Sequence, residues 1–239
     1  WVRARTGHEH EPASFTFKAG DALYRAFECR TVDTLLAFGN NGRVYSVPVA
    51  GLPGARGDGQ PVLTLIELEA GTQLLHYFAG PSQAQLLLSG SGGYGFIAQV
   101  GDMISRQRGG KAFITCNAGE TVCAPSYIGG TSGSVPVPEA THIACASAGG
   151  RLLTFPIGEL RTMPNGGRGL MLMSLEDKDV LIGAAAYTRS IRVQGTGRGG
   201  KPREETLEIR SLNNAAAARG RKGKAADWGF KPQRIGRIE

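Results

Sequence analysis

The chain has 239 residues, 36 of them glycine, and a net charge of +7. Its length allows one large domain or two small ones, and it contains no apolar run of the ~18 residues needed to cross a membrane. Glycine is about twice as frequent as the usual ~7% and follows no three-residue period, which excludes collagen and favours a turn-rich all-β chain. Because Trp1 opens the chain and no secretion signal follows, we interpret it as a soluble domain excised from a cytosolic protein.

The positive charge is concentrated in the last two fifths of the chain. Residues 1–140 carry 10 basic and 11 acidic side chains, a net charge of −1. Residues 141–239 carry 17 basic and 9 acidic side chains, a net charge of +8. A one-sided basic surface indicates a polyanionic partner.

A repeat of about fifty residues organises the chain, a period typical of propellers and solenoids. Its clearest copy has an apolar run at 34–38, a turn at 39–42 and an alternating run at 43–49. Asn-Gly in that turn is a strong hairpin signal, because both central residues of the favoured turn need positive φ. Equivalent hairpins are predicted at 85–98 and 142–157.

A Gly-rich basic segment follows each hairpin. Its Arg-Gly pairs begin at Arg56, Arg108, Arg168 and Arg219, at intervals of 52, 60 and 51 residues. Two further strand-like runs follow each basic segment, and four short strands per unit are typical of a propeller blade.

We therefore predict an all-β, propeller-like β-pinwheel of about five four-stranded antiparallel blades, in a single domain spanning 1–239. The expected units are 1–33, 34–84, 85–140, 141–189 and 190–239, of which the first and last are degraded. The pattern leaves open whether the ring closes and whether terminal strands are exchanged between blades. One short helix is expected from Ser211 to Arg219, with Ser211 as its N-cap.

Two glycine-rich segments resemble nucleotide-binding loops but lack the sequence context of such loops. Residues 90–95 satisfy GxGxxG, yet the following residues are typical of a strand, whereas the motif works at a helix N-terminus. Residues 195–201 approach a phosphate loop, but Pro202 replaces the hydroxyl residue that binds magnesium. We interpret the first as a hairpin and the second as a flexible cationic turn.

The sequence predicts neither a metal site nor a catalytic centre. His8 and His10 would lie on one face of an extended segment, but His76 and His142 lie in strands of separate units. The four cysteines lack the paired spacing of a zinc site, and we expect them to be reduced core residues: Cys29, Cys116, Cys123 and Cys145. No nucleophile elbow or triad order is present.

The basic turns are suited to phosphate. Glycine lets backbone N–H groups approach phosphate closely, and guanidinium offers a bidentate fork. Such contacts position a duplex without reading its sequence. The candidate DNA-binding residues are Arg56, Arg106, Arg108, Lys111, Arg168, Arg198, Lys201, Arg219, Arg221, Lys222 and Lys224.

Several of these segments resemble a known family. Gly42-Arg43-Val44-Tyr45, Leu52-Pro53, Arg56-Gly57 and Gly93-Tyr94-Gly95-Phe96 are similar to repeats of the C-terminal domain of bacterial type IIA topoisomerase A subunits. The resemblance covers essentially the whole chain and is closest between about Ser89 and Ile114. It implies a β-pinwheel whose basic outer edge binds and bends DNA.

The family has a gyrase branch and a topoisomerase IV branch. The gyrase domain carries a Gln-Arg-Arg-Gly-Gly-Lys-Gly box in its first blade, but the equivalent residues 15–21 lack it. The nearest match, at 106–112, lies in the third unit and agrees in register only from Arg108 to Lys111. The chain is therefore more similar to the topoisomerase IV branch, and a gyrase-type wrapping domain is the alternative.

The resemblance also implies what this domain does within a larger enzyme. It would be a non-catalytic accessory domain with no cofactor of its own, because the catalytic Tyr lies upstream and ATP and Mg²⁺ are used elsewhere. Its partners would be nonspecific duplex DNA, the N-terminal breakage-reunion region, the B subunit of topoisomerase IV and a condensin-type complex. We expect a cytoplasmic, nucleoid-associated protein that contacts no membrane. A propeller-type protein-interaction module is the other alternative.

Overall fold

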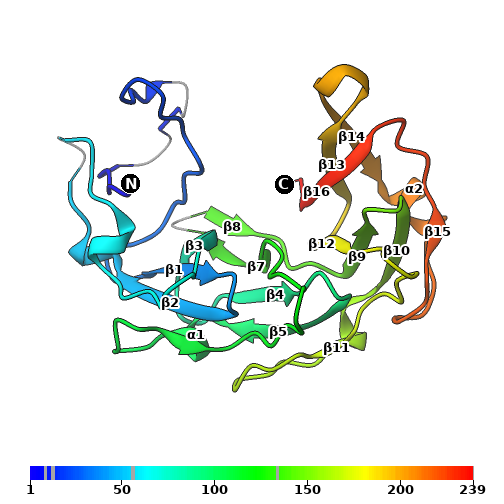
Figure 1. Cartoon of the computed structure of the whole chain (residues 1–239), viewed down its shortest axis with the longest axis horizontal. Coiled ribbons are helices and arrows are strands. Elements are labelled where there is room, and N and C mark those ends of the chain that lie inside the picture. The colour runs from blue at the N-terminus through cyan, green and yellow to red at the C-terminus, as the bar shows by residue number, and fades with distance from the viewer. Residues whose placement is uncertain (8–9, 12–13, 55–56, 133–134, 239) are drawn as a thin grey trace.

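The computed structural model places the strands in four antiparallel sheets, which follow one another in chain order along an arc (Figure 1). The structure describes residues 1–7, 10–11, 14–54, 57–132 and 135–238. The predicted all-β, propeller-like fold is confirmed.

Each sheet is named here by its position in the chain. Sheet 1 has the order β3-β1-β2-β6, from β1 (Thr34–Gly39), β2 (Arg43–Pro48), β3 (Leu74–Gly80) and β6 (Lys111–Ala112). Sheet 2 has the order β11-β5-β4-β7-β8, from β4 (Gln85–Ser89), β5 (Tyr94–Gln99), β7 (Ser126–Ser132), β8 (Val135–Val137) and β11 (Leu170–Met171). Sheet 3 has the order β12-β9-β10-β15, from β9 (His142–Ser147), β10 (Arg151–Pro156), β12 (Leu181–Tyr187) and β15 (Lys224–Ala225). Sheet 4 has the order β14-β13-β16, from β13 (Ser190–Thr196), β14 (Pro202–Glu208) and β16 (Lys231–Arg237).

Short helical turns follow the second strand of each hairpin or lie in loops. They are α1 (Val100–Met103), α2 (Ile209–Asn213), η2 (Val49–Gly51), η3 (Val62–Thr64), η4 (Ile157–Glu159) and η5 (Arg198–Gly200). The expected helix from Ser211 to Arg219 is wrong in its bounds, because α2 begins two residues earlier and ends at Asn213. Ser211 therefore lies inside the helix, and Glu208 is at the N-cap position.

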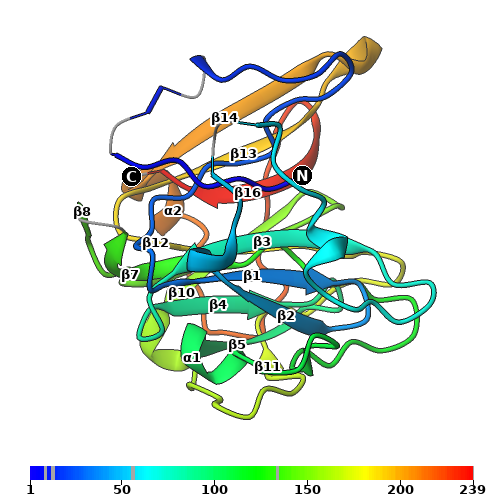
Figure 2. The same ribbon diagram turned by 90° about the vertical axis from the view of Figure 1, so that its left-hand side faces the viewer.

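The three predicted hairpins are confirmed as β1–β2, β4–β5 and β9–β10. Each turn ends on a glycine with positive φ, as Gly42 (φ 76°) does in the first. A side chain there would clash, because a Cβ on Gly42 would overlap the Ile114 carbonyl oxygen. Figure 2 shows β3, β1 and β2 side by side in that order.

Neighbouring sheets are joined by exchange of their outer strand. The two-residue strands β6, β11 and β15 each belong to the following unit but pair with β2, β5 and β10 of the unit before it. The exchanged strands β11 and β15 lie on the outer side of the arc, whereas β3, β12 and β16 lie on its inner side (Figure 1). Exchange of terminal strands, left open by the sequence, is therefore the rule at every boundary between sheets.

The structure contains four sheets where about five were expected. Within the described residues, the first 33 form no sheet and contribute only the isolated bridges Val2–Gln60 and Ala4–Gly54. The exchange at β5 and β10 has the same pattern. In each, one residue of the receiving strand forms an antiparallel pair, and the residue two positions further along forms a parallel pair. Val2–Ala4 therefore occupies the place of a receiving strand, as in a degraded first unit.

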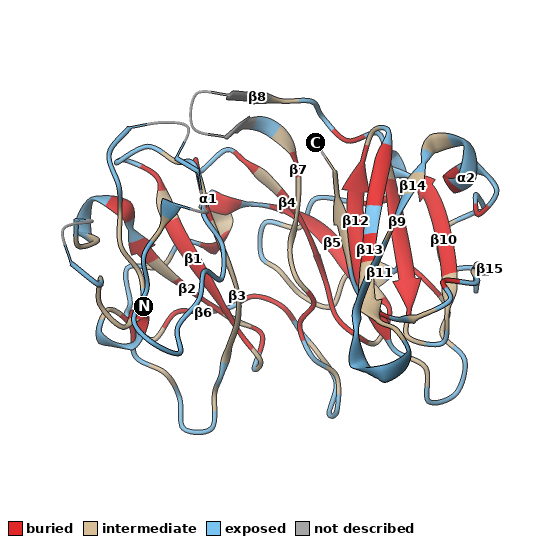
Figure 3. Cartoon of the chain, turned by 90° about the horizontal axis from the view of Figure 1, so that it is seen from above, coloured by how far each residue is buried: buried red, intermediate tan, exposed pale blue. Residues whose placement is uncertain are grey.

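The cores lie between successive sheets. Leu36 and Phe38 of β1 pack toward sheet 2, while Leu35 and Ala37 pack with Val2 and Phe27 of the N-terminal segment. The same alternation occurs in β9, so both faces of sheets 1 to 3 are buried (Figure 3). This two-sided burial explains why these strands appear in the sequence as continuous apolar runs.

Sheet 4 is buried on one face only. Ile191 and Val193 pack against sheet 3, but Arg192 between them is exposed. An exposed polar face cannot support a further blade without desolvating its charges. The sheets therefore form an open arc, with sheet 4 at one end and the N-terminal segment at the other (Figure 1).

Candidate nucleic-acid interface

The predicted basic segments form the turns that lead into the exchanged strands, and we call them exchange turns. Each has a glycine with positive φ directly before the exchanged residue. A Cβ on this glycine would lie 2.2–2.7 Å from a carbonyl oxygen of the receiving strand or segment, and the four pairs are Gly59 with Val2, Gly110 with Val44, Gly169 with Gly95 and Gly223 with Leu152. The recurring glycines therefore have a structural reason, which is the close approach of two backbones.

The eleven predicted DNA-binding residues fall into three groups. Arg56 lies outside the described residues. Within the described chain, five have exposed side chains that make no hydrogen bond or ion pair: Arg106, Arg198, Lys201, Arg221 and Lys224. The other five contact protein atoms: Arg108, Lys111, Arg168, Arg219 and Lys222.

The exchange turn at 106–110 combines one free cation with anchored ones. Arg106 is exposed and extends from the turn. Arg108 Nη2 donates to the Thr64 carbonyl oxygen at 2.7 Å, and the Glu67 N–H donates to the Arg108 carbonyl oxygen at 2.9 Å. Lys111 Nζ donates to the Asp102 carbonyl oxygen at 2.9 Å. The turn is thus fixed while Arg106 remains available.

The exchange turn at 165–169 places its arginine in an ion pair. Arg168 Nη1 and Nη2 donate to the two Glu120 carboxylate oxygens at 2.9 and 2.8 Å. The guanidinium also lies over the Tyr94 ring, 4.2 Å from its centroid. Hydrogen bonding to Arg168 lowers the pKa of Glu120, and hydrogen bonding to Glu120 raises the pKa of Arg168. Both groups are therefore held in their charged forms.

The exchange turn at 219–223 and the first residue of β15 carry two of the free cations. Arg219 Nη1 donates to the Met171 carbonyl oxygen at 2.6 Å, and its backbone N–H donates to Glu159. Arg221 and Lys224 are exposed, and Lys222 Nζ lies 3.9 Å from Glu176, too far for a strong ion pair. Three cations therefore face solvent within four residues.

The β13–β14 hairpin carries a second pair of exposed cations. Arg198 and Lys201 lie in its turn, where the Gly197 N–H donates to the Lys201 carbonyl oxygen at 2.9 Å. Antiparallel strands flank this turn, so it joins two strands of a hairpin and does not lead into a helix as a phosphate loop would. Residues 90–95 likewise form the β4–β5 turn.

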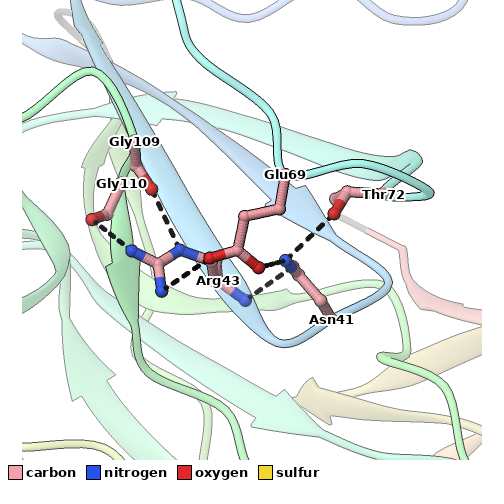
Figure 4. A network of polar contacts seen from close by, with 6 residues as sticks. All are labelled: Asn41, Arg43, Glu69, Thr72, Gly109 and Gly110. Carbon is pink, nitrogen blue, oxygen red and sulfur yellow. Dashed lines mark hydrogen bonds and ion pairs between the residues drawn. The ribbon is translucent and has the colours of Figure 1, made fainter.

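Two arginines that contact exchange turns were not among the candidates. Arg43 begins β2 and donates through Nε and Nη2 to the carbonyl oxygens of Gly109 and Gly110, at 2.9 and 3.2 Å (Figure 4). Arg151 begins β10 and donates to the Gly223 carbonyl oxygen at 3.3 Å. Both directly follow a hairpin glycine, and this shared position is the signal that would have found them.

Of the remaining candidate chemistry, His8 lies outside the described residues. No group of three metal-ligating side chains occurs in the described part of the chain. Cys123 and Cys145 are buried, as expected, whereas Cys29 and Cys116 are only half-buried. Burial raises the pKa of the Cys123 thiol to about 12. None of the described helices has the length and apolar character required to span a bilayer.

The comparisons with known proteins agree with this architecture. Residues 33–68 and 141–187 match the family described as "DNA gyrase C-terminal domain, beta-propeller". The structure of the E. coli ParC C-terminal domain superimposes with a TM-score of 0.80 at 25% sequence identity, covering 98% of this chain and 93% of that one. This chain belongs to the family of C-terminal domains of type IIA topoisomerase A subunits.

Full-length relatives place this C-terminal domain in a longer context. The A subunit of DNA topoisomerase 4 from Neisseria gonorrhoeae is 37% identical over 228 residues, covering 94% of this chain and 28% of the relative. The Escherichia coli K12 protein of that name is 28% identical over 244 residues, covering 100% of this chain and 31% of the relative. The chain thus spans under a third of the curated relatives it matches. A gyrase A C-terminal domain shares the fold, with a TM-score of 0.63 at 18% identity.

Proposed function

We propose that this chain is a non-catalytic DNA-binding domain that holds and bends duplex DNA along the outer edge of its arc. The observation that carries the proposal is the set of exposed, unpaired cations in the exchange turns and the last hairpin. Such side chains lose little on meeting phosphate, because they have no protein partner to give up. Contacts of this kind position the duplex without reading its sequence.

The free cations among the candidate residues form two groups along the chain. The first, which contains Arg106, belongs to the boundary of sheets 1 and 2. The second, at the boundary of sheets 3 and 4 and in the β13–β14 hairpin, comprises Arg198, Lys201, Arg221 and Lys224, next to the loosely paired Lys222. The turn between them, 165–169, has its only cation paired with Glu120. A duplex that contacts both groups would have to follow the curved edge, and this supports bending.

The wider role follows from the relatives. We propose that the domain is part of the A subunit of a topoisomerase IV, where it positions DNA for decatenation and relaxation by the ATP-dependent enzyme. Its partners would then be the breakage-reunion region of the same polypeptide, the B subunit of the enzyme and a condensin-type complex, in the cytoplasm at the nucleoid. ATP and Mg²⁺ would act outside this domain. The better superposition on the ParC domain than on the gyrase domain supports this branch.

The salt dependence of duplex binding tests the proposal. Fluorescence anisotropy with two duplexes of unrelated sequence should give similar affinities, whose logarithm falls with log salt by about 0.9 per neutralised phosphate. Replacing Arg221, Lys222 and Lys224 together by Ala should weaken both and make the slope shallower. Affinity that does not change between about 50 and 200 mM salt would contradict the proposal and favour the alternative of a protein-interaction module.

A further inference from the structure

The arginines of the Arg-Gly pairs are used differently from the other cations of the exchange turns. Every described arginine of an Arg-Gly pair in an exchange turn bonds to the unit that precedes its own turn. Arg108 donates to Thr64, Arg168 to Glu120 and Arg219 to Met171. The recurrence of these arginines thus coincides with contacts that fasten one unit to the next.

Arg168 makes the most complete contact of the three. Its fork meets both oxygens of Glu120, and its side chain and that of Glu120 are only 26% and 20% exposed. A simple exposed ion pair contributes little, but a bidentate and partly buried one is geometrically fixed. The guanidinium also stacks on the face of the Tyr94 ring in a cation–π contact. A phosphate could take the place of this bidentate contact only by displacing Glu120.

The neighbouring boundaries have an equivalent site, but its arginine comes from a different position of the repeat. Arg43, Tyr94 and Arg151 are equivalent, since each follows the hairpin glycine and begins the receiving strand. Where this position is Arg, it contacts the exchange turn and a carboxylate of its own unit: Arg43 lies 3.3 Å from Glu69, and Arg151 lies 2.7 Å from Glu176. Where it is Tyr94, the exchange turn itself supplies the guanidinium as Arg168.

What all three boundaries share is therefore an Arg–Glu pair beside the exchanged strand, whichever unit supplies the arginine. A DNA contact would not require a carboxylate at this place, because a carboxylate repels phosphate. We propose that Arg168 is a positioning residue that, through Glu120 and Tyr94, holds β11 on sheet 2 and so sets the relative placement of the two free cation groups. The DNA part of this proposal rests on the proposed function, whereas the holding of β11 does not.

The test compares Arg168→Ala with Glu120→Gln in the 239-residue chain, because the two changes have opposite effects on free charge. If Arg168 is a positioning residue, both variants should lower the unfolding midpoint, by about 2–4 °C. Both should increase hydrogen exchange at the amides of β11. For a duplex long enough to reach both cation groups, both variants should weaken binding several-fold and reduce the bending measured by end-to-end energy transfer. Binding to a short duplex should be unchanged.

Three results would overturn the proposal. Glu120→Gln that tightens binding while Arg168→Ala weakens it would identify Arg168 as a phosphate ligand. A loss of stability with unchanged long-duplex affinity and bending would leave Arg168 a purely structural role. Unchanged exchange at β11 in both variants would show that the pair does not hold the strand.

Two further variants keep the experiment decisive. Arg168→Lys retains the charge but loses the bidentate fork, so a positioning role predicts the same defects as Arg168→Ala in milder form, even if the alanine variant fails to fold. Arg106→Ala removes a free cation and should make the salt slope shallower without changing exchange at β11. If the wild-type chain bound no DNA, the proposed function would fail, and exchange at β11 would still decide whether Arg168 and Glu120 hold the strand.

Discussion

A Cβ atom on Gly110 would lie 2.7 Å from the carbonyl oxygen of Val44, closer than real Cβ atoms approach. Gly110 also has a φ of 67°, which L side chains rarely adopt. A Cβ atom on the neighbouring Gly109 would instead have no other heavy atom within 4 Å. Two adjacent glycines of one exchange turn thus have different reasons to be present.

This difference predicts a large contrast between two alanine variants. Gly110→Ala should destabilise the chain by about 1–3 kcal/mol, because backbone strain and the approach of β6 to β2 both oppose a side chain. Gly109→Ala should change the free energy of unfolding by less than about 0.5 kcal/mol. Urea unfolding followed by circular dichroism measures both. Equal effects of the two variants would contradict the role assigned to the exchange glycine.

The Glu120–Arg168 pair predicts a specific pH dependence. Hydrogen bonding to Arg168 lowers the pKa of folded Glu120 below that of the unfolded chain, about 4.3 for a free Glu. Stability from this pair is therefore fully present above the unfolded pKa and is lost as the pH falls through the folded pKa. The difference in unfolding free energy between wild type and Glu120→Gln should be large at pH 7 and shrink in acid. An equal difference in unfolding free energy at pH 7 and in acid would contradict this prediction.

The buried thiols predict two classes of cysteine. Burial raises the pKa of Cys123 to about 12 and also raises that of Cys145, so neither forms thiolate near pH 8. Cys29 and Cys116 are half-buried and should react first with a thiol reagent in the native chain. Cys116→Ser should remove one fast-reacting thiol without affecting the slow ones. Four equal rates in the native state would contradict this assignment, whereas equal rates in urea are expected.

The hairpins could be predicted from the sequence because their signals are local. The Asn-Gly turn before Arg43 and the apolar runs on either side are sufficient to define β1 and β2. The exchanged strands could not, because two residues such as Lys111 and Ala112 carry no periodicity. The alanine run after α2 was expected to be helical, but Ala216 instead forms a bridge with Thr154 of sheet 3. Tertiary pairing here outweighs intrinsic helix propensity.

The candidate interface shows the same division between local and distant information. The sequence reveals which segments are basic, and the structure places these segments in exchange turns. Which cation is free depends on partners far along the chain, as Arg168 depends on Glu120 from the preceding unit. The spacing of Arg-Gly pairs therefore identified the turns correctly, but it singled out the arginines that the protein itself uses as anchors.

Lys111 and Lys224 provide a direct test of this distinction, because each begins an exchanged strand and only one is anchored. Lys111 Nζ donates to the Asp102 carbonyl oxygen and lies 5.5 Å from the Phe113 ring centroid, whereas the Lys224 side chain is exposed and unpaired among the described residues. Lys224→Ala should make the slope of log affinity against log salt shallower by up to about 0.9, with stability unchanged. Lys111→Ala should cost about 1 kcal/mol of stability and leave the slope unchanged.

Anisotropy titrations at several salt concentrations and urea unfolding of both variants give the two measurements needed. Lys224→Arg is the matched control, since it retains the charge and should preserve the slope. A shallower slope for Lys111→Ala would mean that the Asp102 hydrogen bond breaks when DNA binds and that anchored cations also contact phosphate. The two equivalent lysines thus separate cations that fasten the fold from cations that meet DNA, at a single position of the repeat.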